Sequence, residues 1–141
     1  MCKPTTRSRR FGLLSVMLLG PVLSGNTVAQ QDSVHKAMQR AFNLRDQAVH
    51  AGDQGYGAVV LRGDQIVGEA PSRVVLANDP TAHAEMEAIR DAVRRLRSRD
   101  LSGCILVSTS RPCRMCEAAA GWARIARMIH GESLIDVGAP S

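Results

Sequence analysis

Two short motifs constrain this sequence more than any other feature. The first is Thr81-Ala82-His83-Ala84-Glu85, and the second is Pro112-Cys113-Arg114-Met115-Cys116. One imidazole and two thiolates are ligands that zinc prefers, and three protein ligands leave the fourth tetrahedral position free for water. Structural zinc sites are normally closed by four protein ligands. The two motifs therefore predict a catalytic Zn²⁺ site held by His83, Cys113 and Cys116.

Each motif on its own has another interpretation. A Cys-x-x-Cys pair where a strand meets a helix is also typical of thiol oxidoreductases. A lone histidine at a helix start is commonly a cap or a packed ring. A periplasmic Cys-x-x-Cys oxidoreductase would give His83 and Glu85 no function. The zinc interpretation is preferred for that reason, and the redox protein stays open as an alternative.

The residues around both motifs resemble a known family. The pairing of H-x-E with P-C-x-x-C is the signature of zinc nucleobase deaminases. The flanking segments are similar to the guanine deaminase branch of the cytidine/deoxycytidylate deaminase superfamily, and bacterial tRNA adenosine deaminases share most of these features. The resemblance covers about Val34 to Gly131. It is carried by residues 57–60, 78–90, 100–104 and 122–125.

The resemblance implies a zinc-dependent hydrolytic deaminase that acts on a nucleobase, a nucleoside or a related small amine. Zinc lowers the pKa of its bound water toward about 7, which provides hydroxide as the nucleophile. Glu85 would carry the proton of that water to a ring nitrogen and then to the departing ammonia. The resemblance also implies substrate contacts at Ala84 and Ser72. Because these families are usually oligomeric, a homo-oligomer is expected.

Two residues and the C-terminus depart from the pattern of the relatives. Arg111 stands where a glutamate usually precedes the Pro-Cys pair, and it could bind an anionic substrate or simply face solvent. Ser72 stands where an asparagine is usual, and a hydroxyl offers no bidentate amide contact. The C-terminus is expected to be shortened, with a last strand near Leu134 but no closing helix. A catalytically degenerate zinc-binding member of the family therefore stays open as a third alternative.

Hydrophobic spacing and turn residues predict one α/β domain over residues 30–141. The strand–helix–strand order near the C-terminus implies parallel pairing with a right-handed crossover. The resemblance implies a three-layer α/β/α sandwich around a mixed sheet, as in cytidine deaminases. Helices are expected over Val34–Ala51, Ala82–Arg97 and Cys113–Ala123, and strands over Tyr56–Leu61, Gln65–Ala70, Cys104–Thr109 and Arg127–His130.

Four side chains of this domain are interpreted from their spacing. The apolar stripe of the second expected helix, projected back one turn, reaches Glu85. A carboxylate that faces the core without a partner lowers the free energy of unfolding, so this position favours a functional role. Cys104 opens an apolar strand and is interpreted as a small core residue. Trp122 and Met128 lie at core spacing and are interpreted as packing residues.

Residues 1–29 are expected to be an export signal. Four basic residues precede Phe11–Leu23, an apolar stretch that is too short to span a bilayer, and Thr27-Val28-Ala29 provides small residues for cleavage. Residues 8–14 resemble a twin-arginine signal. An uncleaved membrane anchor is less favoured because Gly20-Pro21 interrupts the apolar run. The location expected for the mature chain is periplasmic or secreted.

Removing this leader changes what the charge implies. The whole chain carries a net charge of +5, but four of its eighteen basic residues and none of its thirteen acidic residues precede Gln30, which leaves fourteen against thirteen. A nearly neutral domain with few aromatic residues is poorly suited to nucleic-acid binding. The expected substrate is a small amino-purine or amino-pyrimidine, and no nucleic-acid partner is expected.

Overall fold

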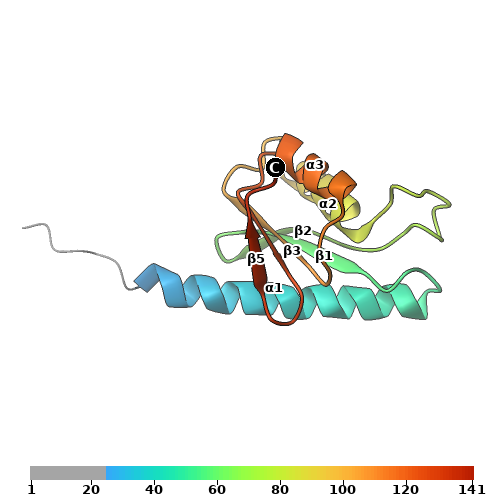
Figure 1. Cartoon of the computed structure of the whole chain (residues 1–141), viewed down its shortest axis with the longest axis horizontal. Helices are drawn as coiled ribbons and strands as arrows, with labels where there is room; N and C mark the ends of the chain where they lie inside the picture. The colour runs from blue at the N-terminus through green and yellow to red at the C-terminus, as the bar shows by residue number, and fades with distance from the viewer. Residues whose placement is uncertain (1–24) are drawn as a thin grey trace, which may run out of the picture.

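The computed structural model of this protein describes residues 25–141 (Figure 1). Five strands form one sheet in the order β2-β1-β3-β4-β5. Residues 1–24 of the expected export signal lie outside the described residues, so the signal stays a prediction. The strands are β1 (Gly57–Arg62), β2 (Gln65–Pro71), β3 (Cys104–Ser108), β4 (Arg127–His130) and β5 (Ile135–Gly138).

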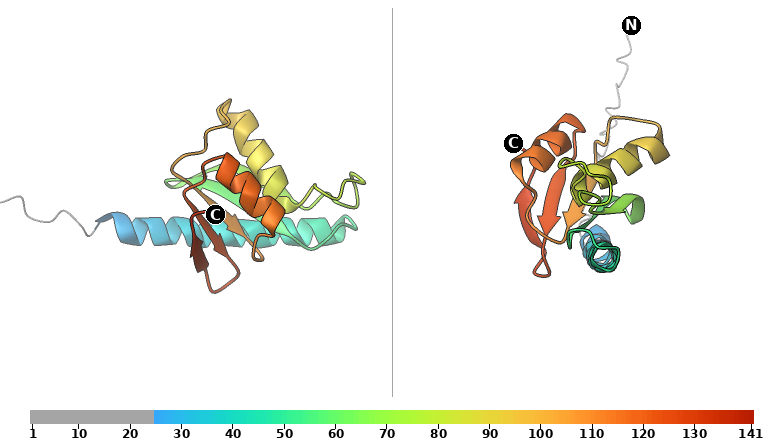
Figure 2. Two further views of the ribbon diagram at one scale, coloured as in Figure 1. Left: turned by 45° about the horizontal axis from the view of Figure 1, so that its top comes forward. Right: turned by 90° about the vertical axis from the view of Figure 1, so that its right-hand side faces the viewer.

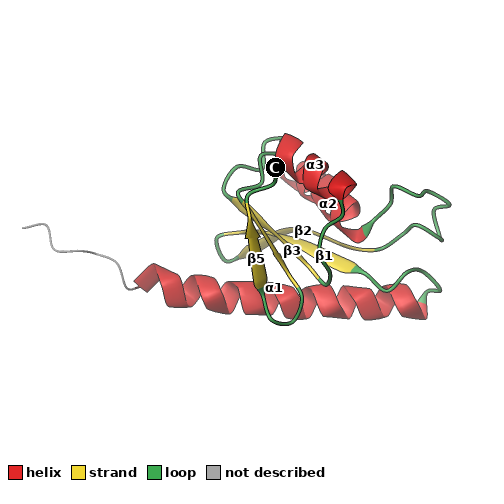
Figure 3. Ribbon diagram, viewed as in Figure 1, coloured by secondary structure: helices red, strands yellow, loops and turns green. Residues whose placement is uncertain are grey.

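Three helices cover the two faces of this sheet. They are α1 (Gly25–His50), α2 (Ala84–Leu96) and α3 (Arg114–Trp122). Figure 2 shows α1 on one side of the sheet and both α2 and α3 on the other, and Figure 3 shows the same three layers coloured by secondary structure. The predicted α/β/α sandwich is confirmed.

The sheet is mixed, as predicted. β3 and β4 pair in parallel, and α3 provides the crossover between them. The other three pairs, β1 with β2, β1 with β3 and β4 with β5, are antiparallel. β3 lies in the middle of the sheet and all five of its residues are buried, so its continuous apolar sequence is the one expected for a strand covered on both faces.

Helix α1 packs on the half of the sheet formed by β1, β2 and β3. It begins at Gly25, earlier than the expected Val34, so its first turn includes the last residues of the expected signal. None of the described helices is both long and apolar enough to cross a membrane. The apolar side of α1 is buried against β1 and β3 through Val34, Ala37, Met38, Ala41 and Leu44.

Helix α2 packs so closely on β2 that there is no room for a side chain at one position of the strand. A Cβ atom added at Gly68 would lie 2.5 Å from the carbonyl oxygen of Ala88 and 2.6 Å from the Cβ atom of Ala92. Small residues on both elements thus allow the backbones to approach. This packing fixes the direction in which the first turn of α2 points.

Two of the packing interpretations are confirmed and one is wrong. Cys104 and Met128 are buried in the core beneath α2 and α3. Trp122 ends α3, and 88% of its surface is exposed. The buried residues of α3 are Cys116 and Ala120, and Trp122 lies six and two positions after them, on a different face of the helix.

Candidate metal centre

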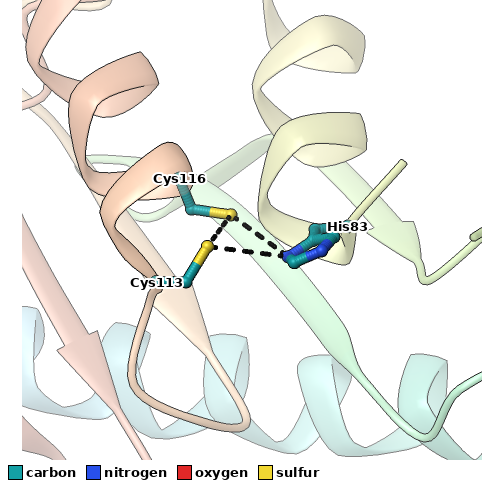
Figure 4. Close-up of side chains that lie close together, drawn as sticks. All are labelled: His83, Cys113 and Cys116. Carbon is teal, nitrogen blue, oxygen red and sulfur yellow. Dashed lines mark hydrogen bonds between the residues drawn. The ribbon is translucent and has the colours of Figure 1, made fainter. Parts of the chain in front are cut away.

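Two helix N-termini bring the two sequence motifs together. His83 is the N-cap residue of α2, and Cys113 is the N-cap residue of α3; both have extended backbone angles. Neither side chain forms the hydrogen bond to the helix backbone that a capping residue normally provides. Both side chains are therefore free to point into the space between the helices (Figure 4).

The third donor comes from the first turn of α3. The Sγ atom of Cys116 lies 3.6 Å from the Sγ atom of Cys113, and each sulfur lies 3.7 Å from Nδ1 of His83. The cysteines are free thiols. The predicted set of donors, His83, Cys113 and Cys116, is thus one compact triangle in the structure.

The dimensions of this triangle can be compared with those of a zinc site. Zinc binds sulfur at about 2.3 Å and nitrogen at about 2.0–2.1 Å, so a tetrahedral site separates two sulfurs by about 3.8 Å and sulfur from nitrogen by about 3.6 Å. The three observed separations are 3.6, 3.7 and 3.7 Å. The donor atoms therefore fit a tetrahedral zinc ion without rearrangement, and a fourth position stays available to a water molecule or a substrate.

Glu85 lies directly beside the donors, in the first turn of α2. Only 5% of its surface is exposed, and the thiol of Cys116 donates to its Oε2 atom across 3.7 Å. Burial raises the pKa of the Glu85 carboxyl, against the opposing effects of its own backbone N–H and of His83. Burial, followed by the nearby Glu85 charge, also raises the pKa of the Cys116 thiol. A carboxyl with a raised pKa is suited to taking up and releasing protons.

A pocket of about 350 Å³ opens in front of this group. Its size lies at the lower end of the range of about 300–1,000 Å³ that small-molecule sites occupy. Arg111 is exposed and lines this pocket, and its contact with a substrate stays a prediction. The lining side chains are Gln54, Tyr56, His83, Glu85, Ser110, Arg111 and Cys113.

Three of these lining residues were missed by the sequence analysis. Tyr56 was expected to open the first strand, but β1 begins one residue later at Gly57, which leaves the ring 45% exposed at the pocket. Gln54 and Ser110 belong to loops, and no local pattern distinguishes them from other polar loop residues.

The other two expected substrate contacts do not line this pocket. Ala84 is buried at the first position of α2, next to His83. Ser72 is also buried, and its hydroxyl donates to Oδ1 of Asp53 at 2.8 Å. Contacts of Ala84 and Ser72 with a substrate stay predictions.

Asp53 holds together the loops beside the pocket. Its carboxylate accepts four hydrogen bonds, from the Ser72 hydroxyl and from the backbone N–H groups of Gln54, Val75 and Leu76. Burial would raise the pKa of Asp53, but these hydrogen bonds outweigh it and hold the pKa below its usual value. This buried acid fixes the loop after β2 to the loop that carries Gln54.

Residues 31–132 match the family model described as the cytidine and deoxycytidylate deaminase zinc-binding region. The chain belongs to the cytidine and deoxycytidylate deaminase family. The matched region contains both motifs and the whole donor triangle. The zinc-binding character of the family therefore agrees with the His/Cys/Cys group that could hold a metal ion in this chain.

Two curated relatives place this chain in the branch of the family that the motifs indicated. The guanine deaminase of Bacillus subtilis is 43% identical over 88 residues, which cover 62% of this chain and 56% of that protein. The tRNA-specific adenosine deaminase of Aquifex aeolicus is 41% identical over 89 residues, which cover 63% of this chain and 59% of that protein. The chain thus spans little more than half the length of these relatives.

Solved structures confirm the fold of this family in the chain. The X-ray structure of the Bacillus subtilis guanine deaminase is 38% identical and has a TM-score of 0.65, with 68% of this chain and 62% of that chain covered. A structure from a study of A-to-I editing by tRNA:A34 deaminases is 34% identical and has a TM-score of 0.66, with 68% and 70% covered. The predicted cytidine-deaminase-like fold is confirmed.

Proposed function

We propose that this protein is a zinc-dependent hydrolytic deaminase of a small amino-purine or amino-pyrimidine. One observation carries the proposal: a donor triangle with the dimensions of a zinc site lies in direct contact with a buried carboxyl group, at the floor of a pocket. Membership in the deaminase family supports the same reaction.

In the proposed reaction, water adds to the amino-bearing ring carbon, the C–N bond breaks, ammonia leaves, and the ring carbon gains a carbonyl oxygen. His83, Cys113 and Cys116 would hold the zinc ion, which when bound supplies Lewis acidity that lowers the pKa of a water toward about 7. Glu85 takes one proton from the water at its carboxylate and gives it to a ring nitrogen. It then takes the second proton from the hydroxyl added to the ring carbon and gives it to the leaving amine, so that ammonia leaves as the carbonyl forms. Its burial keeps bulk water away from this exchange.

The substrate class rests on the relatives and on the pocket. A related structure, 27% identical with a TM-score of 0.65, was solved with 2,6-diaminopurine bound, and 69% of this chain and 55% of that chain are covered. A pocket of about 350 Å³ in this chain suits a single heterocycle. The exposed ring of Tyr56 offers an aromatic surface at the side of this pocket.

The same proposal includes a location outside the cytoplasm and a homo-oligomer. Export is supported by the basic and apolar pattern of residues 1–29. The exposed Trp122 supports an oligomer, since a large exposed aromatic side chain is common in contact surfaces. Fractionation followed by N-terminal mass analysis tests export. Light scattering of the purified protein tests the oligomer.

The metal content and ammonia release of the purified protein test the central proposal. We expect about one zinc ion per chain and ammonia release from at least one member of a panel of amino-purines, amino-pyrimidines and pterins. Treatment with a chelator should abolish the release, and added zinc should restore it. A metal-free protein with a Cys113–Cys116 disulfide would instead support the thiol oxidoreductase. Full zinc content with no release from any substrate would support the catalytically degenerate alternative.

A further inference from the structure

Arg111 brings a positive charge to the proposed active-site pocket, and none of the carboxylates between residues 25 and 141 forms an ion pair with it. Seven arginines of the described residues form ion pairs with aspartate or glutamate, but Arg111 does not pair with any carboxylate between residues 25 and 141. It lines the pocket from the loop between β3 and α3. An unpaired guanidinium at a pocket is available to an anion, because it has five N–H donors and no acceptor.

The loop that carries Arg111 is fixed at its base. The backbone N–H of Thr109 donates to the carbonyl of Gly57 at 3.0 Å, and the N–H of Gly57 donates to the Thr109 hydroxyl at 3.2 Å. The Ser108 hydroxyl also donates to the carbonyl of Ser110 at 2.6 Å. These bonds attach the loop to β1 within two residues of Arg111. The side chain therefore extends from a well-positioned backbone.

Burial places Arg111 and Glu85 at opposite depths of the pocket. Glu85 is almost completely buried at the floor, His83 is half-buried, and Arg111 is exposed at the rim. A substrate whose amino-bearing carbon reaches Glu85 would extend its other end toward the rim. An anionic group there would lose little of its hydration while it bonds to the guanidinium.

The other charges and donors of the pocket favour an anion at the rim. Glu85 is the one carboxylate among the lining residues of this pocket, and it lies away from the rim. The N-termini of α2 and α3, which His83 and Cys113 cap, both add positive potential. The amide of Gln54 and the phenol of Tyr56 supply further hydrogen-bond donors beside Arg111.

We propose that Arg111 determines substrate specificity by binding an acidic substituent, a phosphate or a carboxylate, on the amino-heterocycle. This inference rests on the proposed function, and it assigns the substrate to the anionic amino-heterocycles. The pocket volume of about 350 Å³ fits one ring system with a compact substituent. Arg111 acts as a positioning residue for ground-state binding, so its main effect is expected on KM rather than on kcat.

Matched pairs of substrates test this inference. One pair compares cytosine with 5-carboxycytosine, and the others compare nucleosides with their 5′-monophosphates. For the wild-type protein we expect kcat/KM to be about tenfold higher for the anionic member of at least one pair, and this preference should weaken at high salt. The pair that shows the preference distinguishes a carboxylate from a phosphate substituent.

The variant Arg111→Gln should remove this preference through a higher KM for the anionic member, with a smaller effect on the KM of the neutral one. Arg114→Gln is the matched control, since Arg114 is also exposed and unpaired among the described residues but does not line the pocket. Equal effects of Arg111→Gln on both members of every pair would overturn the inference. So would loss of the preference in Arg114→Gln.

Measurements of substrate affinity distinguish a failure of this inference from a failure of the proposed function. Titration calorimetry of the Glu85→Gln variant measures the affinity for each substrate without turnover. Tighter binding of the anionic member that depends on Arg111 supports the inference even if the wild-type protein releases no ammonia, an outcome that would reject only the deaminase reaction. Ammonia release without any Arg111-dependent preference would support the reaction and reject the inference.

Discussion

The thiol of Cys116 donates a hydrogen bond to the carboxyl of Glu85, with its Sγ atom 3.7 Å from Oε2. The side chain proposed to carry the proton therefore touches a side chain proposed to hold the metal. The contact joins the first turns of α2 and α3, which are far apart in the sequence. Because of this contact, a metal ion held by Cys116 and the carboxyl of Glu85 can act on the same substrate atom. Mutation should separate the contribution of the metal to the reaction from that of the carboxyl.

The substitution Glu85→Gln should abolish ammonia release while the zinc remains bound. General acid–base catalysis contributes about 10²–10⁴-fold, so we expect the rate to fall by at least about 100-fold. Zinc content by atomic absorption and ammonia release are measured on the same sample. Glu87→Gln is the control, because Glu87 lies in the same helix turn but pairs with Arg90. Full activity of Glu85→Gln would remove this residue from the mechanism.

Cysteine substitutions distinguish the metal ligands from the core thiol. Cys113→Ala and Cys116→Ala should each lose zinc on dialysis, because two protein donors hold the ion much less tightly than three. Cys104→Ala should keep its zinc, since this buried thiol accepts from Nε of Arg62 at 3.4 Å and lies outside the donor triangle. Its expected cost is stability alone, about 1–2 kcal/mol for a small cavity. Equal zinc content in all three variants would contradict the assignment.

Asp53→Asn should lower stability in a way that depends on pH. The lowered folded-state pKa means that the carboxylate stabilises the fold above its unfolded pKa of about 3.9, and that this contribution is lost as the pH falls through the folded-state pKa. We expect a loss of about 1.5–3 kcal/mol in the free energy of unfolding at pH 7. The reason is that the NH2 group of asparagine cannot accept the hydrogen bonds that one of the two carboxylate oxygens accepts in the wild-type protein. Urea denaturation at several pH values measures it.

The comparison with the wild-type protein decides this prediction. The difference in unfolding free energy should begin to narrow as the pH falls below the unfolded pKa of about 3.9, and should narrow further as Asp53 of the folded wild-type protein becomes neutral at its lower pKa. Ser72→Ala is a graded control, since it removes one of the four hydrogen bonds that the carboxylate accepts. A difference that stays constant at every pH would mean that the charge of Asp53 has no part in the effect.

The local elements were predictable because their apolar spacing is strong. β4 has the expected bounds, Arg127–His130. β2 and β3 differ from their expected bounds by one residue at one end, and β1 differs by one residue at both ends. The start of α1 was not predictable, since the expected cleavage site assigned its first turn to the leader. The packing role expected for Trp122 was wrong because this residue lies on a different face of α3 from the buried Cys116 and Ala120, which leaves its ring exposed.

The metal donors were predictable for a different reason. Their identity and spacing restrict the chemistry so strongly that His83, Cys113 and Cys116 could be assigned together before any geometry was known. The pocket wall has no such signature. Asp53 accepts three of its four hydrogen bonds from residues 19 to 23 positions further along the chain, and Tyr56 reaches the pocket only because β1 begins after it. Such contacts depend on how distant loops meet.

Two glycine substitutions test the packing that directs α2 toward the site. Gly68→Ala should destabilise the protein by about 1–3 kcal/mol, because its Cβ would lie 2.5 Å from the carbonyl oxygen of Ala88 and the helix would have to move. Gly121→Ala is the matched control in α3, where the nearest atom, in Pro140, is 3.8 Å away and the change should be neutral or stabilising. Thermal unfolding measures both effects. Because α2 carries His83 and Glu85, Gly68→Ala should also weaken zinc binding, and a fully stable variant would show that the close contact is not required.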